Sequence, residues 1–366
     1  MASTVVSMDF LDTRTTLVVL YGGQSAEHDV SCVTAAHVLH AVDHSVYRTV
    51  PIAISRDGSW HLPDMDQLPH GGVDPNKVPD HLHATGEQTT TAVIAQLSAN
   101  NSTVVMPLLH GPLGEDGTIQ GLLELLDLPY VGSAVLASAV AMDKGVSKMI
   151  FAHAGIPQVR HLTFREDQIN DAALVGAAAT LGFPMFVKPA NMGSSVGVSK
   201  AHNADELRTA CALATQYDQW VICEEAVTAR EIEVAVIGNR TPTASIVGEI
   251  IPGNEFYDYE DKYVTDAATL NIPAHLTAEQ SDTVRALAIR AYEALHCEGM
   301  ARVDFFFEES GRGFLCNEIN TIPGFTPISM YPKLWAASGL AYPDLIDQLI
   351  QHAIERHARR KRHTAR

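Results

Sequence analysis

The spacing of apolar residues changes near residues 131–137, and this change limits the folds open to the chain more than any other feature. Before it, apolar runs at residues 17–20, 50–54 and 103–109 alternate with helical patterns. That alternation predicts a parallel sheet with helices on its faces. Residues 57–101 are rich in Pro, Gly, His and Thr, so we interpret them as an excursion that is not part of the sheet.

After the change, short apolar strands dominate the pattern. They are expected at residues 185–188, 196–200, 221–224, 232–237, 245–251, 301–307 and 314–319. Helices are expected at residues 138–153, 204–215, 278–295 and 343–358. This part of the chain should therefore be α+β and largely antiparallel. A length of 366 residues suggests two or three domains, and we place them at residues 1–132, 133–227 and 228–366.

The charge balance limits the partners of the chain. It has 25 basic and 43 acidic residues, a net charge of −18. A protein this acidic is poorly suited to bind nucleic acid or an anionic membrane. Neither partner is therefore expected. The one basic cluster, at residues 356–366, is interpreted as a solvated helix end.

Neither a signal peptide nor a membrane span is indicated. Residues 1–16 lack a basic start followed by an apolar run. The longest weakly polar stretch, residues 131–142, is well short of the ~20 residues that a span needs. The five cysteines include no C-x-x-C pair, so free buried thiols in a reducing cytoplasm are expected.

Three common motifs do not occur in the sequence. There is no G-x-x-x-x-G-K-[ST] phosphate loop, no G-x-G-x-x-G fingerprint and no H-E-x-x-H metal motif. The pair Gly22-Gly23 therefore does not indicate a dinucleotide site, and a dinucleotide-dependent oxidoreductase is disfavoured.

The segment from Arg302 to Asn320 predicts a β-hairpin, because two apolar runs flank a polar turn around Gly311. With the turn centred there, Asp304 faces Glu318 and Arg302 faces Asn320. Like charges directly opposite destabilise a sheet, but a cation between them reverses the effect. Mg²⁺ binds carboxylate and amide oxygens, so Asp304, Glu318 and Asn320 are candidate metal ligands. The alternative is a polar face exposed to water, with the register shifted by one.

Two further segments suggest a nucleotide. Lys188 ends an apolar strand and a Gly- and Ser-rich turn follows, whose N–H groups could bind phosphate beside the lysine charge. Residues 224–231 carry Glu224 at one end and Glu231 at the other, and these carboxylates could hold adenine and ribose. The alternatives are an ordinary hairpin and a solvated charged turn.

Taken together, these segments resemble the D-alanine–D-alanine ligase family of the ATP-grasp superfamily. The resemblance runs from about Val18 to His352 and is weakest over residues 57–101. Its six motifs, in the family's order, are G-G-Q-S-A-E-H-D-V-S from Gly22, H-G-P-L-G-E-D-G from His110, M-D-K from Met142, V-K-P-A-N-M-G-S-S-V-G from Val187, F-Y-D-Y-E-D-K-Y from Phe256 and N-E-I-N-T-I-P-G-F-T from Asn317. The resemblance implies a Rossmann-like parallel-sheet domain followed by two α+β subdomains that bind ATP between them.

The resemblance also implies how ATP is bound. The matching positions are Lys144 and Lys188 for the phosphates, Glu224 and the backbone of Val227 for adenine, Glu231 for ribose, and Lys262 on the loop of residues 256–263. Asp304, Glu318 and Asn320 match the ligands of two Mg²⁺ ions, with Mn²⁺ as an alternative ion. Glu225 is a lysine in some relatives, so its role is left open.

For the amino-acid substrates, other positions match. They are Glu27 for the ammonium of the first D-alanine, Arg302 and the N–H of Gly324 for the tetrahedral intermediate, Ser329 for the carboxylate of the second D-alanine, and His110 and Tyr257 as further substrate contacts. Ser194 and Tyr263 match the partners that link the loop of residues 256–263 back to Glu27. That loop is expected to close as a lid, because the reaction passes through an acyl phosphate that water would hydrolyse.

The expected activity is ATP-dependent joining of two D-alanine molecules through D-alanyl phosphate, for peptidoglycan precursors, by a cytoplasmic homodimer. Two alternatives stay open. A D-alanine–D-lactate ligase of the same fold would lack a tyrosine at the position of Tyr263. A nucleotide-binding regulator that no longer catalyses would not need the intact set of lysines, arginine and carboxylates.

Overall fold

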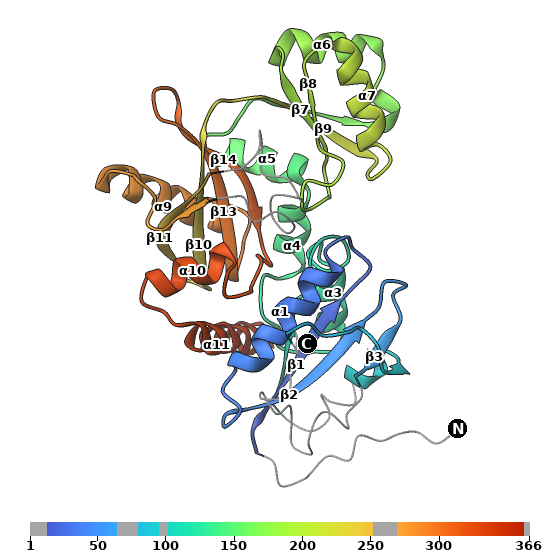
Figure 1. The fold of residues 1–366 in the computed structure, drawn as a ribbon, viewed down its shortest axis with the longest axis vertical. Coiled ribbons are helices and arrows are strands. Elements are labelled where there is room, and N and C mark those ends of the chain that lie inside the picture. Colours follow the sequence, from blue (N-terminus) through green and yellow to red (C-terminus); the bar gives the residue numbers. More distant parts are fainter. Residues whose placement is uncertain (1–12, 64–79, 95–101, 252–268, 362–366) are drawn as a thin grey trace.

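The computed structural model describes residues 13–63, 80–94, 102–251 and 269–361, and in these it forms three sheets (Figure 1). Each of the three domains predicted from the sequence contains one sheet. The exact domain boundaries remain predictions. No helix in the described ranges is long and apolar enough to cross a membrane. All five cysteines are free and buried, as expected.

The first sheet has the strand order β4-β3-β2-β1-β5. Its strands are β1 (Thr15–Gly22), β2 (Tyr47–Ile54), β3 (Trp60–Leu62), β4 (Glu87–Thr89) and β5 (Thr103–Pro107). The expected parallel pairing of β1 with β2 and β5 is confirmed. The interpretation of residues 57–101 as lying outside the sheet was wrong, because β3 and β4 extend its edge in antiparallel pairs. Trp60 and Leu62 pack against the core under the sheet, which the polar composition of this segment concealed.

Helices cover both faces of the first sheet because successive β1 residues point to opposite sides. Leu17 and Val19 pack with α1 (His28–Ala41), whereas Val18 and Leu20 pack with α3 (Thr118–Leu125).

The connection to the second sheet consists of two helices rather than the single helix expected over residues 138–153. They are α4 (Val135–Met142) and α5 (Lys144–His153). Asp143 between them is extended, with φ −78° and ψ 99°, and its carboxylate accepts a hydrogen bond from the Val146 amide at 2.9 Å. This N-cap restarts the helix and fixes where the side chains of α5 point.

The second sheet is antiparallel throughout its described strands and has the order β6-β9-β7-β8. Its elements are β6 (His161–Arg165), α6 (Asp171–Leu181), β7 (Met185–Pro189), β8 (Ser199–Ala201), α7 (Ala204–Ala214) and β9 (Trp220–Glu225). Val187 and Cys223 face α6 and α7 in a common core. The alternate residues Lys188 and Glu224 are therefore left on the opposite face, toward the rest of the molecule.

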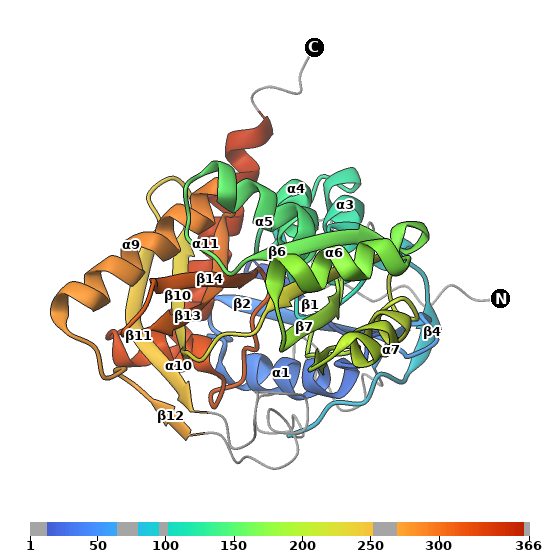
Figure 2. The ribbon, with the colours of Figure 1, turned by 90° about the horizontal axis from the view of Figure 1, so that it is seen from above.

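The third sheet is also antiparallel, in the order β12-β11-β10-β13-β14. Its strands are β10 (Arg230–Gly238), β11 (Thr243–Ile251), β12 (Thr269–Asn271), β13 (Gly299–Glu308) and β14 (Gly313–Asn320). Helix α9 (Ala278–Ala294) packs on one face, and α10 (Met330–Ala337) packs on the other (Figure 2). On the α10 face, apolar Ile237 and Met300 give way along the strands to Glu233, Arg302 and Asp304.

The last helix, α11 (Tyr342–Lys361), joins the first and third sheets in one core. The interpretation of its basic end as solvated was wrong for Arg356, whereas Arg360 is exposed and residues 362–366 lie outside the described ranges. Arg356 is 2% exposed, stacks over the Tyr130 ring and donates hydrogen bonds to the carbonyls of Tyr130 and Gly132. Arg359 pairs with Glu298. Arg356 thus ties α11 to the linker that leaves the first sheet, and Arg359 ties it to the residue before β13.

Candidate active site

Two cavities meet at the polar end of the third sheet. The first, of about 580 Å³, is lined by Lys188 and Glu224 of the second sheet and by Asp304 of the third. The second, of about 760 Å³, is lined by Glu27 from the first domain and by Ser329 before α10. The side chains that line both cavities include Lys144, Ser194, Glu233, Arg302 and Glu318. A group transferred from one cavity to the other would pass these residues.

Lys188 and Glu224 lie on the wall that the second sheet contributes to the first cavity. The Nζ atom of Lys188 lies 2.7 Å from Oε2 of Glu224, and Nζ of Lys148 on α5 lies 2.9 Å from Oε1. Burial alone would raise the pKa of Glu224, but the two ammonium groups outweigh it and lower that pKa to about 2. Glu224 is therefore ionised and can only accept hydrogen bonds.

The other residues expected to bind ATP lie around the same cavity. Val227 and Glu231 line it beside Glu224. Lys144, at the start of α5, lies 3.3 Å from Glu318 Oε2 and donates to the Met192 carbonyl at 2.8 Å. The structure thus brings Lys144, Lys188, Glu224, Val227 and Glu231 to one cavity.

The hairpin of β13 and β14 has the expected register, and this prediction is confirmed. Asp304 pairs with Glu318, and Arg302 pairs with Asn320. The amide of Asn320 donates to Asp304 Oδ2 at 2.9 Å. Asn317, the residue before Glu318, lines the first cavity, and its Oδ1 atom is buried with no hydrogen-bond partner among the described residues. This set of carboxylate and amide oxygens fits a hard divalent cation.

Arg302 lies between two carboxylates at the junction of the cavities. Its Nε and Nη2 atoms donate to the two oxygens of Asp304 at 2.7 Å each, and Nε lies 3.0 Å from Glu233 Oε2. Burial would lower the pKa of the guanidinium, but Asp304 and Glu233 raise it, so Arg302 stays charged. A fixed, charged, planar donor therefore lies where the cavities join.

In the second cavity, Ser194 is joined to Glu27. Ser194 Oγ donates to Glu27 Oε1 at 2.5 Å. The Gly- and Ser-rich turn makes this approach possible, because a Cβ atom on Gly193 would lie 3.0 Å from Glu27 Oε2 and Ser194 has a left-handed φ of 49°. The turn expected to bind phosphate therefore also contacts the expected amino-acid site.

The remaining substrate candidates also line the second cavity. His110 is buried, which lowers its pKa, and Nδ1 donates to the Ile322 carbonyl at 3.1 Å. Its Nε2 atom has no hydrogen-bond partner among the described residues. Gly324 and Ser329 lie together, since a Cβ atom on Gly324 would be 3.1 Å from Ser329 Oγ.

Three of the expected site residues lie outside the described ranges. They are Tyr257, Lys262 and Tyr263, all on the loop of residues 256–263. Their roles stay predictions.

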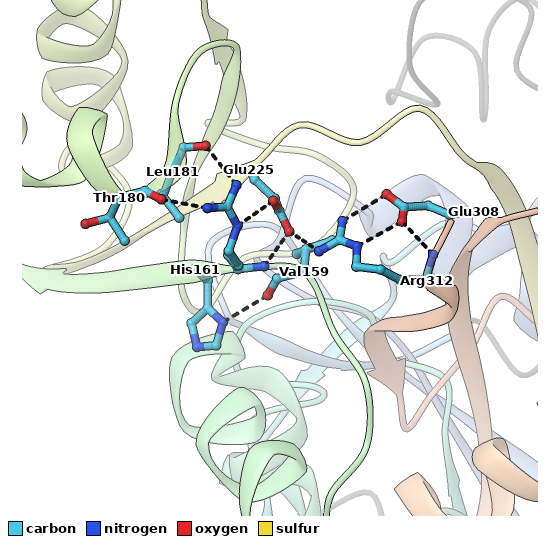
Figure 3. Close-up of polar contacts among 8 residues, drawn as sticks. Val159, His161, Thr180, Leu181, Glu225, Glu308 and Arg312 are labelled. Atoms are coloured by element: carbon cyan, nitrogen blue, oxygen red, sulfur yellow. Dashed lines mark hydrogen bonds and ion pairs between the residues drawn. The ribbon is translucent and has the colours of Figure 1, made fainter. Parts of the chain in front are cut away.

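Glu225, whose role was left open, joins the second sheet to the third (Figure 3). It accepts hydrogen bonds from Arg160 N at 2.8 Å, from Arg160 Nε at 2.7 Å and from Arg312 Nη1 at 2.6 Å. Arg312 also pairs with Glu308 at 2.8 Å, beside the turn of the β13–β14 hairpin. Arg160 donates as well to the carbonyls of Thr180 and Leu181 at the end of α6. The chain of ion pairs therefore fastens together the two sheets that enclose the first cavity.

Three ionisable residues of the site were missed by reasoning from the sequence. Lys148 was detectable as the residue one helical turn after Lys144. Glu233 was detectable as a carboxylate in an otherwise apolar strand. Glu115 lies in the H-G-P-L-G-E motif, and burial and then Glu27 raise its pKa to about 8.

A parallel-sheet domain followed by two antiparallel units that enclose a cavity of lysines and carboxylates defines a ligase of the ATP-grasp class. Comparison with known proteins narrows the class. The D-ala D-ala ligase N-terminus matches residues 16–133, and the D-ala D-ala ligase C-terminus matches residues 150–351. The chain therefore belongs to the D-alanine–D-alanine ligase family.

Individual relatives and solved structures agree with this assignment. The D-alanine–D-alanine ligase of Solibacter usitatus is 46% identical over 345 residues, covering 94% of this chain and 97% of that protein. The D-alanine–D-alanine ligase structure from Coxiella burnetii superposes with a TM-score of 0.80 at 34% identity, covering 95% of this chain and 96% of that one. The VanG D-Ala:D-Ser ligase structure from Enterococcus faecalis superposes with a TM-score of 0.79 at 32% identity, covering 93% of this chain and 99% of that one.

Proposed function

We propose that this protein is a D-alanine–D-alanine ligase that uses ATP to join two D-alanine molecules and releases ADP and phosphate. The observation that carries the proposal is the meeting of two cavities at Lys144, Arg302 and Glu318. A nucleotide in the first cavity and amino acids in the second would bring the γ-phosphate and the acceptor carboxylate to the same place. Positioning of this kind supplies much of the rate of phosphoryl transfer.

The first step is phosphorylation of the first D-alanine. Its carboxylate is a poor electrophile until it becomes an acyl phosphate, so it attacks the γ-phosphorus of ATP and ADP leaves. Lys144 and Lys188 lie at the first cavity and would balance the charge that spreads over the transferring group. Glu27, held by Ser194, would bind the ammonium of this D-alanine.

Magnesium is part of the proposal. Asp304, Glu318 and Asn320 would hold it. The buried Oδ1 of Asn317 beside them has no hydrogen-bond partner among the described residues and is a further oxygen that suits such a cation. The ion would neutralise phosphate charge when bound. Arg302 and Lys144 form ion pairs with the carboxylates of Asp304 and Glu318.

The second step forms the amide bond. The amine of the second D-alanine attacks the acyl carbon, a tetrahedral oxyanion forms, and phosphate leaves as the carbonyl is restored. Arg302 and the N–H of Gly324 would stabilise the oxyanion. Ser329, beside Gly324, would contact the carboxylate of the incoming D-alanine.

Three finer statements are part of the same proposal. The product would serve peptidoglycan precursor synthesis, the enzyme would act in the cytoplasm, and it would be a homodimer. The family assignment and the net charge of −18 support a soluble enzyme without nucleic-acid partners.

The identity of the second substrate is the point at which family members differ. One similar structure is that of a D-Ala:D-Ser ligase, and ester-forming relatives use D-lactate.

Phosphate release from ATP, measured with and without D-alanine, tests the proposed chemistry. Release that depends on D-alanine supports a ligase, whereas binding of ATP with no release in either case would indicate a regulator.

A further inference from the structure

The most deeply buried charge beside the first cavity is Lys148. Its side chain is 0% exposed, and it does not line either cavity. It reaches Glu224 from behind, with Nζ 2.9 Å from Oε1, while Lys188 reaches Oε2 from the cavity side. An ammonium group therefore lies against each oxygen of Glu224, and the contact from Lys148 is an ion pair without hydrogen-bond geometry. Only Lys188 of these two partners faces the ligand space.

The fold alone gives little reason for this ammonium. Placing an ion in the interior costs several kcal/mol, and well-packed apolar residues of similar volume are often at least as stable as a buried ion pair. Lys148 lies on α5, where its buried neighbour Phe151 is apolar. A methionine would continue this packing, so we attribute the lysine to its effect on Glu224.

The second partner of Glu224 cannot do the same work during the reaction. Lys188 lines the first cavity and is the residue proposed to contact the phosphates. When it turns to phosphate, Lys148 is the one cation left at the carboxylate among the residues that the structure describes. His161, which pairs with Glu224 across β6 and β9, does not replace it, because burial and then Lys148 itself lower the pKa of His161.

A carboxylate fixed in this way distinguishes two kinds of purine. An ionised carboxylate only accepts hydrogen bonds. Adenine presents a 6-amino donor, whereas 6-oxo purines present an acceptor at the same place. A protonated or reoriented Glu224 would lose this distinction.

We propose that Lys148 is a positioning residue that holds Glu224 as an acceptor and so makes the enzyme select 6-amino over 6-oxo purine nucleotides. This inference rests on the proposed function, in which Glu224 contacts adenine.

The test compares ATP with inosine triphosphate, whose base differs at position 6 by an oxygen. Wild type, Lys148→Met, Glu224→Gln and the double variant are assayed for kcat/KM with each nucleotide at saturating D-alanine. Lys148→Met should lower the ATP-to-inosine-triphosphate ratio roughly 10-fold, chiefly through KM for ATP. Glu224→Gln should lower it at least as much, and the double variant should match Glu224→Gln because the two residues act as one unit.

The ratio separates positioning from general loss of structure, because unfolded enzyme lowers both rates equally. Phe151→Leu, a buried change on the same helix, is the matched control and should leave the ratio unchanged. An unchanged ratio in Lys148→Met, with a lowered ratio in Glu224→Gln, would overturn the role of Lys148 and leave the adenine site intact. An unchanged ratio in both variants would overturn the adenine role of Glu224 as well.

Discussion

Asp304 of β13 and Glu318 of β14 lie directly opposite each other because a β-bulge at Asn317 adds one residue to β14. On the turn side of the bulge, Phe305 pairs with Cys316, so an unbroken ladder would have paired Asp304 with Asn317. Bulges often redirect side chains beside active sites. Here the bulge places Asn317 and Glu318 on the wall of one cavity.

Two facing carboxylates in this position predict that turnover depends on a divalent cation. Excess chelator should abolish activity, and added Mg²⁺ should restore it. Glu318→Gln should raise the Mg²⁺ concentration needed for half-maximal activity by at least roughly 10–100-fold. Loss of a residue that only supports a metal ligand already weakens metal binding by about that factor. Full activity in excess chelator would count against a metal at Asp304 and Glu318.

Arg302→Lys should lose most activity while ATP still binds. Lysine keeps the charge but lacks the planar guanidinium. It therefore cannot donate to both Asp304 oxygens and to an oxyanion at the same time. We expect kcat to fall roughly 10²–10³-fold, as for other lost oxyanion donors. Arg165→Lys, on the exposed end of β6, is the control and should behave as wild type. Near-normal kcat in the Arg302 variant would remove this residue from the mechanism.

The contact between Ser194 and Glu27 predicts a route to altered choice of the second substrate. Tyr263 is expected to complete this hydrogen-bonded set from the loop of residues 256–263. Loss of its phenol oxygen in Tyr263→Phe should raise the ratio of D-alanyl-D-lactate to D-alanyl-D-alanine, most clearly below neutral pH, where the competing amine is more fully protonated.

Ser194→Ala removes the 2.5 Å hydrogen bond to Glu27 and should shift the same ratio in the same direction. Both variants are compared with wild type at matched D-alanine and D-lactate concentrations across a pH series. If both products fall together at every pH, the residues only close the site and do not select the substrate.

Glu225 should contribute to stability through its hydrogen bonds with Arg160 and Arg312. Burial would raise the pKa of Glu225, but these hydrogen bonds outweigh it and lower the pKa. Glu225→Gln should therefore reduce the free energy of unfolding near neutral pH by about 1–3 kcal/mol. Asp171→Asn breaks an exposed pair with Arg208 and should change it much less. Equal thermal shifts in both variants would contradict a special role for Glu225.

The same network gives a direction to the pH dependence of stability. A carboxylate with a lowered pKa in the folded protein stabilises it above the unfolded pKa, and this contribution disappears as the pH falls through the folded pKa. Hydrogen bonds from Arg312 lower the pKa of Glu308 from 4.5 to about 2, so its contribution should be lost across that interval. Thermal unfolding at a series of pH values should show the Glu225→Gln difference shrinking over acidic pH. A difference that grows on acidification would contradict this assignment.

The hairpin could be predicted from the sequence because two apolar runs flank a polar turn around Gly311. The prediction assumed a turn centred on Gly311 and no bulge. The observed turn is centred half a residue earlier, and the bulge at Asn317 adds one residue to β14. These two differences cancel at Asp304, so its predicted pairing with Glu318 was correct. The break at Asp143 was not predicted, and it is revealed by the cap hydrogen bond that the Val146 amide donates to the Asp143 carboxylate.

Long-range ion pairs could not be predicted in the same way. Lys148 and Glu224 are 76 residues apart, and Arg160, Glu225 and Arg312 come from three separate segments. Each looks like a surface charge in its own local pattern, and the pairings appear only when the sheets are placed together. The same reason explains Arg356, whose basic neighbours suggested solvent and whose partners lie on the linker after the first sheet.

The most direct test of the central claim is a product assay with ATP and Mg²⁺ in which D-alanine, D-serine, D-lactate and L-alanine compete at equal concentrations. The proposal predicts D-alanyl-D-alanine as the main product, with one ADP and one phosphate formed for each dipeptide. L-Alanine should not be incorporated. A different main product, or ADP formation without any joined product, would contradict the proposed D-alanine–D-alanine ligase activity.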